Sequence, residues 1–225
     1  MQTNFTRALG LRHPIVQAPM AGANATPPEL VAAVSNAGAL GFIGAAYMSP
    51  HDIAEHCRSV QEKTDRPFGV NLFVPTPVPL VPNAESTART LVAAYHTELD
   101  IPAPVAPVSP RLNFDDQLEA VLASGARVFS STFGNLSPAR VARLKDKGIF
   151  VIGTATTVAE AIELERSDVD AIVAQGSEAG GHRGTFAGPF DESMIGAMAL
   201  VPQIVDAVHV PVLASGGIMD GRSII

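Results

Sequence analysis

The sequence predicts an α/β fold, a TIM-type (β/α)8 barrel that is incomplete. Short apolar runs alternate with amphipathic segments along most of the 225 residues. The runs are apolar nearly throughout, which is typical of parallel strands buried on both faces. The first strand-to-helix turn, QAPMAGANA, has no GxGxxG pattern, and the glycine pairs follow the last two expected strands. This placement favours a barrel over an open doubly wound sheet.

The first half of the chain begins this alternation of strands and helices. Strands are expected at 15–20, 40–46 and 67–75. A helix is expected at 27–38, where paired prolines open it and a glycine can end it. Another is expected at 49–64, where a serine cap precedes a proline.

A proline-rich excursion at about 76–112 interrupts the alternation. It holds one amphipathic helix between two segments whose prolines cannot join a central strand. We therefore expect a loop or lid here, within a single domain that covers 1–225.

The alternation resumes after the excursion. The remaining expected helices are 113–125, 137–148, 157–168 and 196–208, and the remaining strands are 126–134, 149–156, 170–176 and 210–217. The final residues, IMDGRSII, contain only the start of another helix. The sequence thus predicts about seven of the eight βα units of a barrel, with the eighth strand missing.

Composition and charge exclude several classes of partner. Hydrophobic residues make up 47% of the chain, enough for a sizeable core, and the formal net charge is −7 without a long run of either sign. This argues against a nucleic acid or an anionic membrane as a partner. No apolar stretch approaches the ~20 residues of a membrane span, so we expect a cytoplasmic protein. Cys57 is the only cysteine, which excludes an internal disulfide.

Polar residues at the ends of the expected strands mark a candidate ligand site. Asn71 and Gln175 place amides where apolar residues would suit a buried strand better, so we expect them to contact a ligand. The turn at Ala18, Pro19 and Met20 can lie against a flat ligand, and an ordinary tight turn is the alternative.

The stretch 178–186, EAGGHRGTF, is the most distinctive part of the chain. Gly180 and Gly181 lack Cβ atoms, so the backbone before His182 can approach something large and flat. An imidazole beyond the end of a buried strand can accept a proton or hold an anion. Glu178 and Arg183 either orient this imidazole or form a surface pair. No histidines and carboxylates show the spacing of metal ligands, so no metal site is expected.

A second glycine pair follows the last expected strand in the stretch ASGGI. Ser215, Gly216 and Gly217 would offer backbone amides at the head of a helix. The positive end of the helix dipole and unpaired N–H groups suit a phosphate group.

Five segments together resemble the nitronate monooxygenase family, formerly called 2-nitropropane dioxygenases. They are IVQAPMAG, GVNLF, GTATTVAEA, QGSEAGGHRGTF and PVLASGGIMDGR. The resemblance runs through essentially the whole chain. It implies a TIM barrel with FMN at its mouth, which oxidises alkyl nitronates such as propionate 3-nitronate, or nitroalkanes, with O2 through a flavin semiquinone.

The resemblance also implies roles for the candidate residues. The residues expected to hold FMN are Ala18, Pro19 and Met20 along the isoalloxazine, Asn71 and Gln175 at its polar edge, Gly180 and Gly181 near the ring, and Ser215, Gly216 and Gly217 at the phosphate. His182 matches the family's catalytic histidine, which positions the nitronate or takes the α-proton of a nitroalkane. The implied partners are the nitro compound and O2, and a homo-oligomer stays open.

Family members continue through an eighth strand that completes the phosphate site, so the resemblance implies a chain truncated at its C-terminal side. Two other functions stay open. A flavin-dependent enoyl-acyl-carrier-protein reductase shares the barrel and an EAGGH-like block but uses NAD(P)H. A barrel unable to hold FMN would instead serve as an interaction module.

Overall fold

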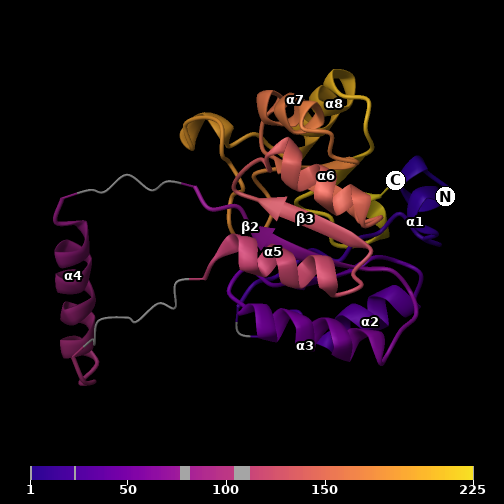
Figure 1. The fold of residues 1–225 in the computed structure, drawn as a ribbon. Coiled ribbons are helices and arrows are strands. Elements are labelled where there is room, and N and C mark those ends of the chain that lie inside the picture. The colour runs from indigo at the N-terminus through magenta and orange to yellow at the C-terminus, as the bar shows by residue number, and fades with distance from the viewer. Residues whose placement is uncertain (1, 23, 77–81, 104–111, 225) are drawn as a thin grey trace. The chain divides into compact units, whose positions relative to one another are not determined.

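The structure, a computed structural model, describes residues 2–22, 24–76, 82–103 and 112–224. The chain divides into two compact units, one formed by Met1–Thr76 and Leu112–Ile225 and the other by Pro77–Arg111. The larger unit contains the sheet and most of the helices (Figure 1).

The sheet of the larger unit is parallel throughout, and its strand order follows the chain. Its strands are β1 (Gly41–Gly44), β2 (Phe68–Phe73), β3 (Val128–Thr132), β4 (Phe150–Ala155), β5 (Ala171–Gln175) and β6 (Val212–Ser215). Each strand lies within the range expected from its apolar run. The carboxyl ends of all six therefore meet at one edge of the sheet, where a barrel carries its ligand site.

The expected first strand, 15–20, is not a regular strand. Its segment pairs with β1 and the residue before it through two isolated bridges, Val16 to Leu40 and Ala21 to Gly44. Between them, the Gln17 side-chain Oε1 accepts a hydrogen bond from the Phe42 amide at 3.0 Å, in the place of a backbone carbonyl. A nearby proline at position 19 has no amide to donate, so a continuous ladder cannot form.

The helices of the larger unit follow the strands as expected. They are α2 (Pro28–Asn36), α3 (Pro50–Gln61), α5 (Phe114–Ala123), α6 (Pro138–Asp146), α7 (Val158–Arg166) and α8 (Ala197–Ala207). Prolines occupy the first turn of α2, α3 and α6. Side chains of Ser49, Asn113 and Thr157 cap α3, α5 and α7 by accepting backbone hydrogen bonds. All six helices lie within their expected ranges, and the proline and serine-cap signals predicted for 27–38 and 49–64 are confirmed in α2 and α3.

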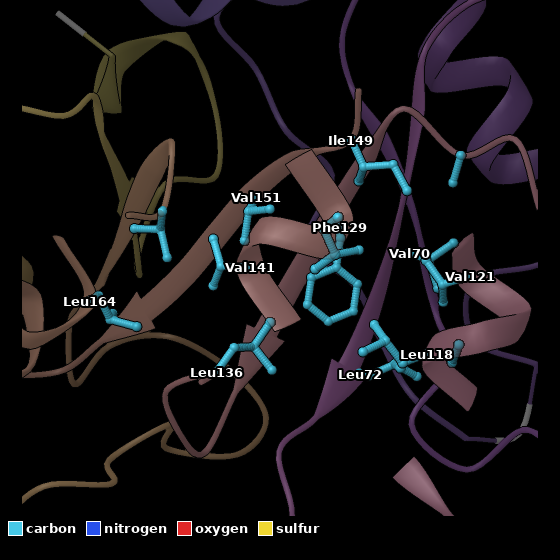
Figure 2. Packing of buried hydrophobic residues seen from close by; sticks show 14 of the residues in the cluster. Val70, Leu72, Leu118, Val121, Phe129, Leu136, Val141, Ile149, Val151 and Leu164 are labelled. Carbon is cyan, nitrogen blue, oxygen red and sulfur yellow. The ribbon is translucent and has the colours of Figure 1, made fainter. Parts of the chain in front are cut away.

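One apolar layer lies between the sheet and these helices. The Phe129 side chain of β3 is fully buried in it, close to Leu118 of α5 and Val141 of α6 (Figure 2). Val70 of β2 and Val151 of β4 belong to the same layer. Burial of apolar surface stabilises a fold by about 25 cal/mol per Å². This apolar layer therefore holds the helices on the sheet.

A second apolar layer lies on the other face of the sheet and includes a helix that the sequence analysis missed. Helix α1 (Asn4–Leu9) is capped by Thr3 at its start and by Gly10, in the left-handed region, at its end. Its Phe5 ring meets the Phe150 ring edge-on at 5.8 Å, in a cluster with Phe42 of β1. The strands are thus buried on both faces, as in a barrel, and the predicted fold class is confirmed.

The smaller unit contains the expected helix of the excursion, α4 (Ala84–Glu98). None of its residues is buried, and Leu91, Tyr95 and Leu99 are exposed. Much of the two proline-rich segments, 77–81 and 104–111, lies outside the described residues. The role of this unit as a loop or lid stays a prediction.

Candidate functional site

A cavity of about 640 Å³ lies at the carboxyl ends of the strands. Its volume is in the range of small-molecule and cofactor sites. The predicted site residues that line it are Ala18, Pro19, Met20, Asn71, Gln175, Gly180, Gly181, His182 and Ser215. The topology thus brings together residues that are separated by almost the whole chain.

The turn at Ala18, Pro19 and Met20 is packed onto the end of β1. Thr26, which is 2% exposed, donates to the Met20 carbonyl at 3.2 Å and accepts from the Gly44 amide at 2.8 Å. A side chain at Gly44 would collide with the Met20 backbone. The turn is therefore fixed against the strand while its other side faces the cavity.

Asn71 is buried within β2 and is anchored by its amide nitrogen. Nδ2 donates to Ser130 Oγ at 2.9 Å, to the Ser130 carbonyl at 3.2 Å and to Thr132 Oγ1 at 3.3 Å. Within the described ranges, Oδ1 has no hydrogen bond. Asn71 would thus offer a ligand in the cavity an acceptor.

Gln175, at the end of β5, uses both ends of its amide on the loop that follows. Nε2 donates to the His182 carbonyl at 3.0 Å, and Oε1 accepts from the Gly184 amide at 2.7 Å. The sequence predicted a ligand contact for this side chain. Its observed partners are backbone groups on either side of Arg183, so Gln175 braces the loop that carries His182.

The three glycines of EAGGHRGTF have different surroundings. A Cβ at Gly180 or Gly181 would meet nothing within 4 Å, and Gly181 has a φ of 80°, which favours glycine. A Cβ at Gly184 would lie 3.1 Å from Thr132 Cγ2 and 3.2 Å from Thr154 Cγ2. The first two glycines leave open space at the cavity, whereas the third allows the loop to pack on the strand ends.

His182 is exposed at the cavity, and its ring packs against aromatic rings. Its ring lies 6.0 Å from Phe73 and 5.7 Å from Phe133, both edge-on, and Tyr47 packs on Phe73 at 5.6 Å. In the part of the chain that the structure describes, no hydrogen bond reaches the imidazole. Its ring nitrogens are therefore available to a ligand.

Glu178 and Arg183 are neither partners of His182 nor an ion pair, so both readings from the sequence are wrong. The Glu178 carboxylate accepts the Ala197 amide at 2.8 and 3.1 Å, at the start of α8, and this hydrogen bond lowers the pKa of Glu178. Arg183 donates to three carbonyls, those of Gln175, Ser193 and Thr156, and burial lowers the pKa of Arg183. Both side chains fix the loop to its surroundings.

Glu160 is a residue of this region that the sequence analysis missed. It is fully buried in the first turn of α7, where TVAE has the spacing of a capping box. The Thr157 side chain does accept the Glu160 amide at 3.2 Å. The Glu160 carboxylate, however, accepts hydrogen bonds from Thr156, Phe186 and Ala187. The sequence can indicate the helix cap, but it cannot indicate that the Glu160 carboxylate binds Phe186 and Ala187 of the loop.

The hydroxyls at the ends of β3 and β4 contact other polar side chains or line the cavity. Asn71 contacts Ser130 and Thr132, and Thr156 contacts Glu160. Ser130, Thr132 and Thr154 line the cavity.

The expected phosphate turn differs from the prediction. Ser215 lines the cavity, but Gly216 and Gly217 have φ of 119° and 71°, which no helical residue adopts. The next helical turn is a three-residue 3-10 helix, Gly221–Ser223, whose Arg222 amide donates to Asp220 at 2.9 Å. Contrary to the prediction, the amides of Gly216 and Gly217 do not lie at the head of a helix in the described residues. The amides of Gly216 and Gly217 make no hydrogen bond within residues 112–224 and the other described ranges.

Two features are absent from the residues that the structure describes. No group of three His, Cys, Asp or Glu side chains there is arranged to hold a metal ion. No helix there has the length and apolar character needed to cross a membrane.

Comparison with known proteins identifies the family. The nitronate monooxygenase family model matches residues 4–225. A probable nitronate monooxygenase of Staphylococcus saprophyticus is 43% identical over 227 residues, which cover 100% of this chain and 63% of the relative. The chain thus spans 63% of the length of this curated relative.

Solved structures agree with this assignment. Nitroalkane oxidase from Streptomyces ansochromogenes is 37% identical with a TM-score of 0.88, over 99% of this chain and 63% of that one. FabK from Thermotoga maritima is 29% identical with a TM-score of 0.72, over 100% of this chain and 57% of that one. Sequence and structure agree over nearly the whole length, and the chain belongs to the nitronate monooxygenase family.

Proposed function

We propose that this chain forms the flavin-binding part of an oxidoreductase that oxidises alkyl nitronates or nitroalkanes with O2. The observation that carries the proposal is an exposed imidazole without a hydrogen-bond partner in the described residues, at a cavity of about 640 Å³. The family and the nitroalkane oxidase structure support the same class of reaction.

The residues present fit FMN. Open space around Gly180 and Gly181 would admit a planar ring, and Asn71 Oδ1 would accept a hydrogen bond from its polar edge. The amides of Gly216 and Gly217 would donate to the phosphate. Bound FMN would supply the redox chemistry, taking electrons from the nitro substrate and passing them to O2.

The chain's own contribution to the reaction would come from His182. A ring nitrogen of this imidazole would take the α-proton of a nitroalkane or, when protonated, hold the anionic nitronate. The rings of Phe73 and Phe133, which meet the imidazole edge-on, would limit its rotation.

A visible spectrum after addition of FMN tests the cofactor. We expect the purified protein to turn yellow and to keep the flavin through gel filtration. A colourless protein would contradict the proposal and support an interaction module. Bleaching of the flavin by NADPH without oxygen would instead support the enoyl reductase.

Substitution of the histidine tests its role. His182→Asn should lower oxygen consumption with a nitronate or nitroalkane by about 100-fold or more, while flavin stays bound. His209→Asn is the matched control, because the His209 side chain is 97% exposed and lies after α8. Unchanged turnover in His182→Asn would remove His182 from the mechanism.

A further inference from the structure

We propose that Glu160 is a positioning residue for His182, which it places through the backbone of the loop that follows β5. The inference rests on the proposed function only for its effect on turnover. The placement itself concerns the chain alone.

The Glu160 carboxylate is fully buried and each of its oxygens has two donors. Oε2 accepts the Thr156 amide at 2.6 Å and the Thr156 hydroxyl at 2.7 Å. Oε1 accepts the Phe186 amide at 2.6 Å and the Ala187 amide at 2.9 Å. One oxygen thus binds the end of β4, and the other binds the loop.

Helix α7 does not need a buried carboxylate at position 160 for its own capping. Thr157 already caps the helix, and an exposed glutamate at the same position would complete an ordinary capping box. Removing a carboxylate from water costs several kcal/mol unless hydrogen bonds compensate. Two of the four compensating donors belong to the loop, so ordering of the loop and burial of Glu160 depend on each other.

Hydrogen bonds continue from these amides back to His182. The Thr185 hydroxyl lies 2.8 Å from Thr156 Oγ1 and 2.6 Å from Ser193 Oγ. Gln175 then binds the Gly184 amide and the His182 carbonyl, as described above. From 182 to 187 the loop is therefore held at almost every residue.

Within the residues that the structure describes, the imidazole has no hydrogen-bonded anchor of its own, and the rings of Phe73 and Phe133 pack against it edge-on. Its position at the cavity is therefore set by the backbone that carries it. Release of Phe186 and Ala187 from Glu160 would let that backbone shift. Because a shift of about 1 Å at a reacting group is costly to catalysis, Glu160 would affect turnover without touching a ligand.

Glu160→Gln tests the inference, with Glu163→Gln as the matched control from the exposed face of the same helix. Glutamine has the size of glutamate, but its NH2 group is a donor. On one side of the side chain it would therefore face backbone amides that are also donors. In the protein without flavin or substrate, we expect amide hydrogen exchange at Phe186 and Ala187 to accelerate at least 10-fold. We also expect the NMR signals of the His182 ring to shift, because its distance to the two phenylalanine rings changes.

In the FMN-loaded protein, kcat for a nitroalkane should fall about 10-fold in Glu160→Gln while flavin affinity stays within about 2-fold. Unchanged exchange and unchanged His182 signals would overturn the inference, even if stability fell. If Glu160→Gln does not fold, Glu160→Asp, one methylene shorter, is judged by the same two measurements. If the parent protein itself shows no turnover, that result counts against the proposed function. Hydrogen exchange and the His182 NMR signals would still decide the inference about Glu160.

Discussion

The two glycine-pair turns of this chain look alike in sequence and differ in structure. The EAGGHRGTF loop after β5 is bound to its surroundings by Gln175, Arg183 and Glu160. The ASGGI turn after β6 has left-handed glycines and amides that are free within the described residues, and just beyond it Asp220 and Arg222 form a local pair. A glycine pair after a strand thus indicates a candidate ligand site, but it does not predict whether the loop at that site is rigid.

The difference follows from the polar residues around the glycines. In the first loop, three buried or half-buried polar side chains convert backbone carbonyls and amides into anchors. In the second, polar side chains bind near neighbours and remain exposed. The first loop is suited to holding a reacting group in place, and the second to accepting an anion.

The two arginines should give the largest contrast. Arg183→Met removes a guanidinium from three buried backbone carbonyls, so we expect it to lower the free energy of unfolding by about 2–4 kcal/mol. Arg222→Met removes an exposed pair with Asp220 and should leave stability unchanged. Urea unfolding of both variants measures this. Equal effects would show that the two loops are anchored alike.

Substitutions at two glycines of the first loop should affect different properties, one the stability of the fold and the other the binding of FMN. Gly184→Val forces methyl groups against Thr132 and Thr154, and we expect a loss of about 1–3 kcal/mol. Gly180→Val points into open space, so it should leave stability unchanged and weaken FMN binding. Thermal unfolding and flavin titration of both variants check the pair. A Gly180→Val protein with normal flavin affinity would place the ring elsewhere.

In the second turn, the effect of a glycine substitution on stability should depend on backbone conformation alone. Gly217 has a φ of 71°, where an alanine costs about 1 kcal/mol, so Gly217→Ala should lower the unfolding free energy by that amount. Gly221→Ala, four residues on, meets no atom and has no such φ, and should be neutral. Thermal unfolding distinguishes these results. A neutral Gly217→Ala would mean that the turn adopts another conformation in solution.

The smallest effect should be a dependence on pH. The Ala197 amide lowers the pKa of Glu178 below the ordinary value of 4.5, so this carboxylate stabilises the fold above pH 4.5. The contribution is lost as the pH falls through the lowered pKa of the folded state. Glu178→Gln should therefore flatten the acid side of a stability profile. The exposed Glu192, in the same loop, offers Glu192→Gln as the control, which should keep the parent profile.

Much of this architecture could be predicted because its signals are local. Continuous apolar runs placed six strands, and caps and prolines placed the helices that follow. The convergence of parallel strands at one edge then placed Asn71 and His182 at one cavity. Helix α1 was missed because six residues carry little periodicity, although Thr3 and Gly10 mark its ends.

The partners of the polar side chains could not be predicted. Whether Gln175 faces a ligand or the loop depends on where the loop passes, which is set by contacts far apart in the chain. The same holds for Arg183 and Glu160, whose partners include residues up to 27 positions away. The sequence identifies the residue types at a site, and tertiary geometry assigns them to a ligand or to the fold.

The order of the strands also bears on how the chain assembles during synthesis. Each strand pairs with the one made just before it, so an emerging polypeptide can extend the sheet one edge at a time. The cavity, however, draws on residues from Ala18 to Ser215. A nascent chain released before β6 would carry most of the sheet but would lack the part of the cavity lining that β6 supplies.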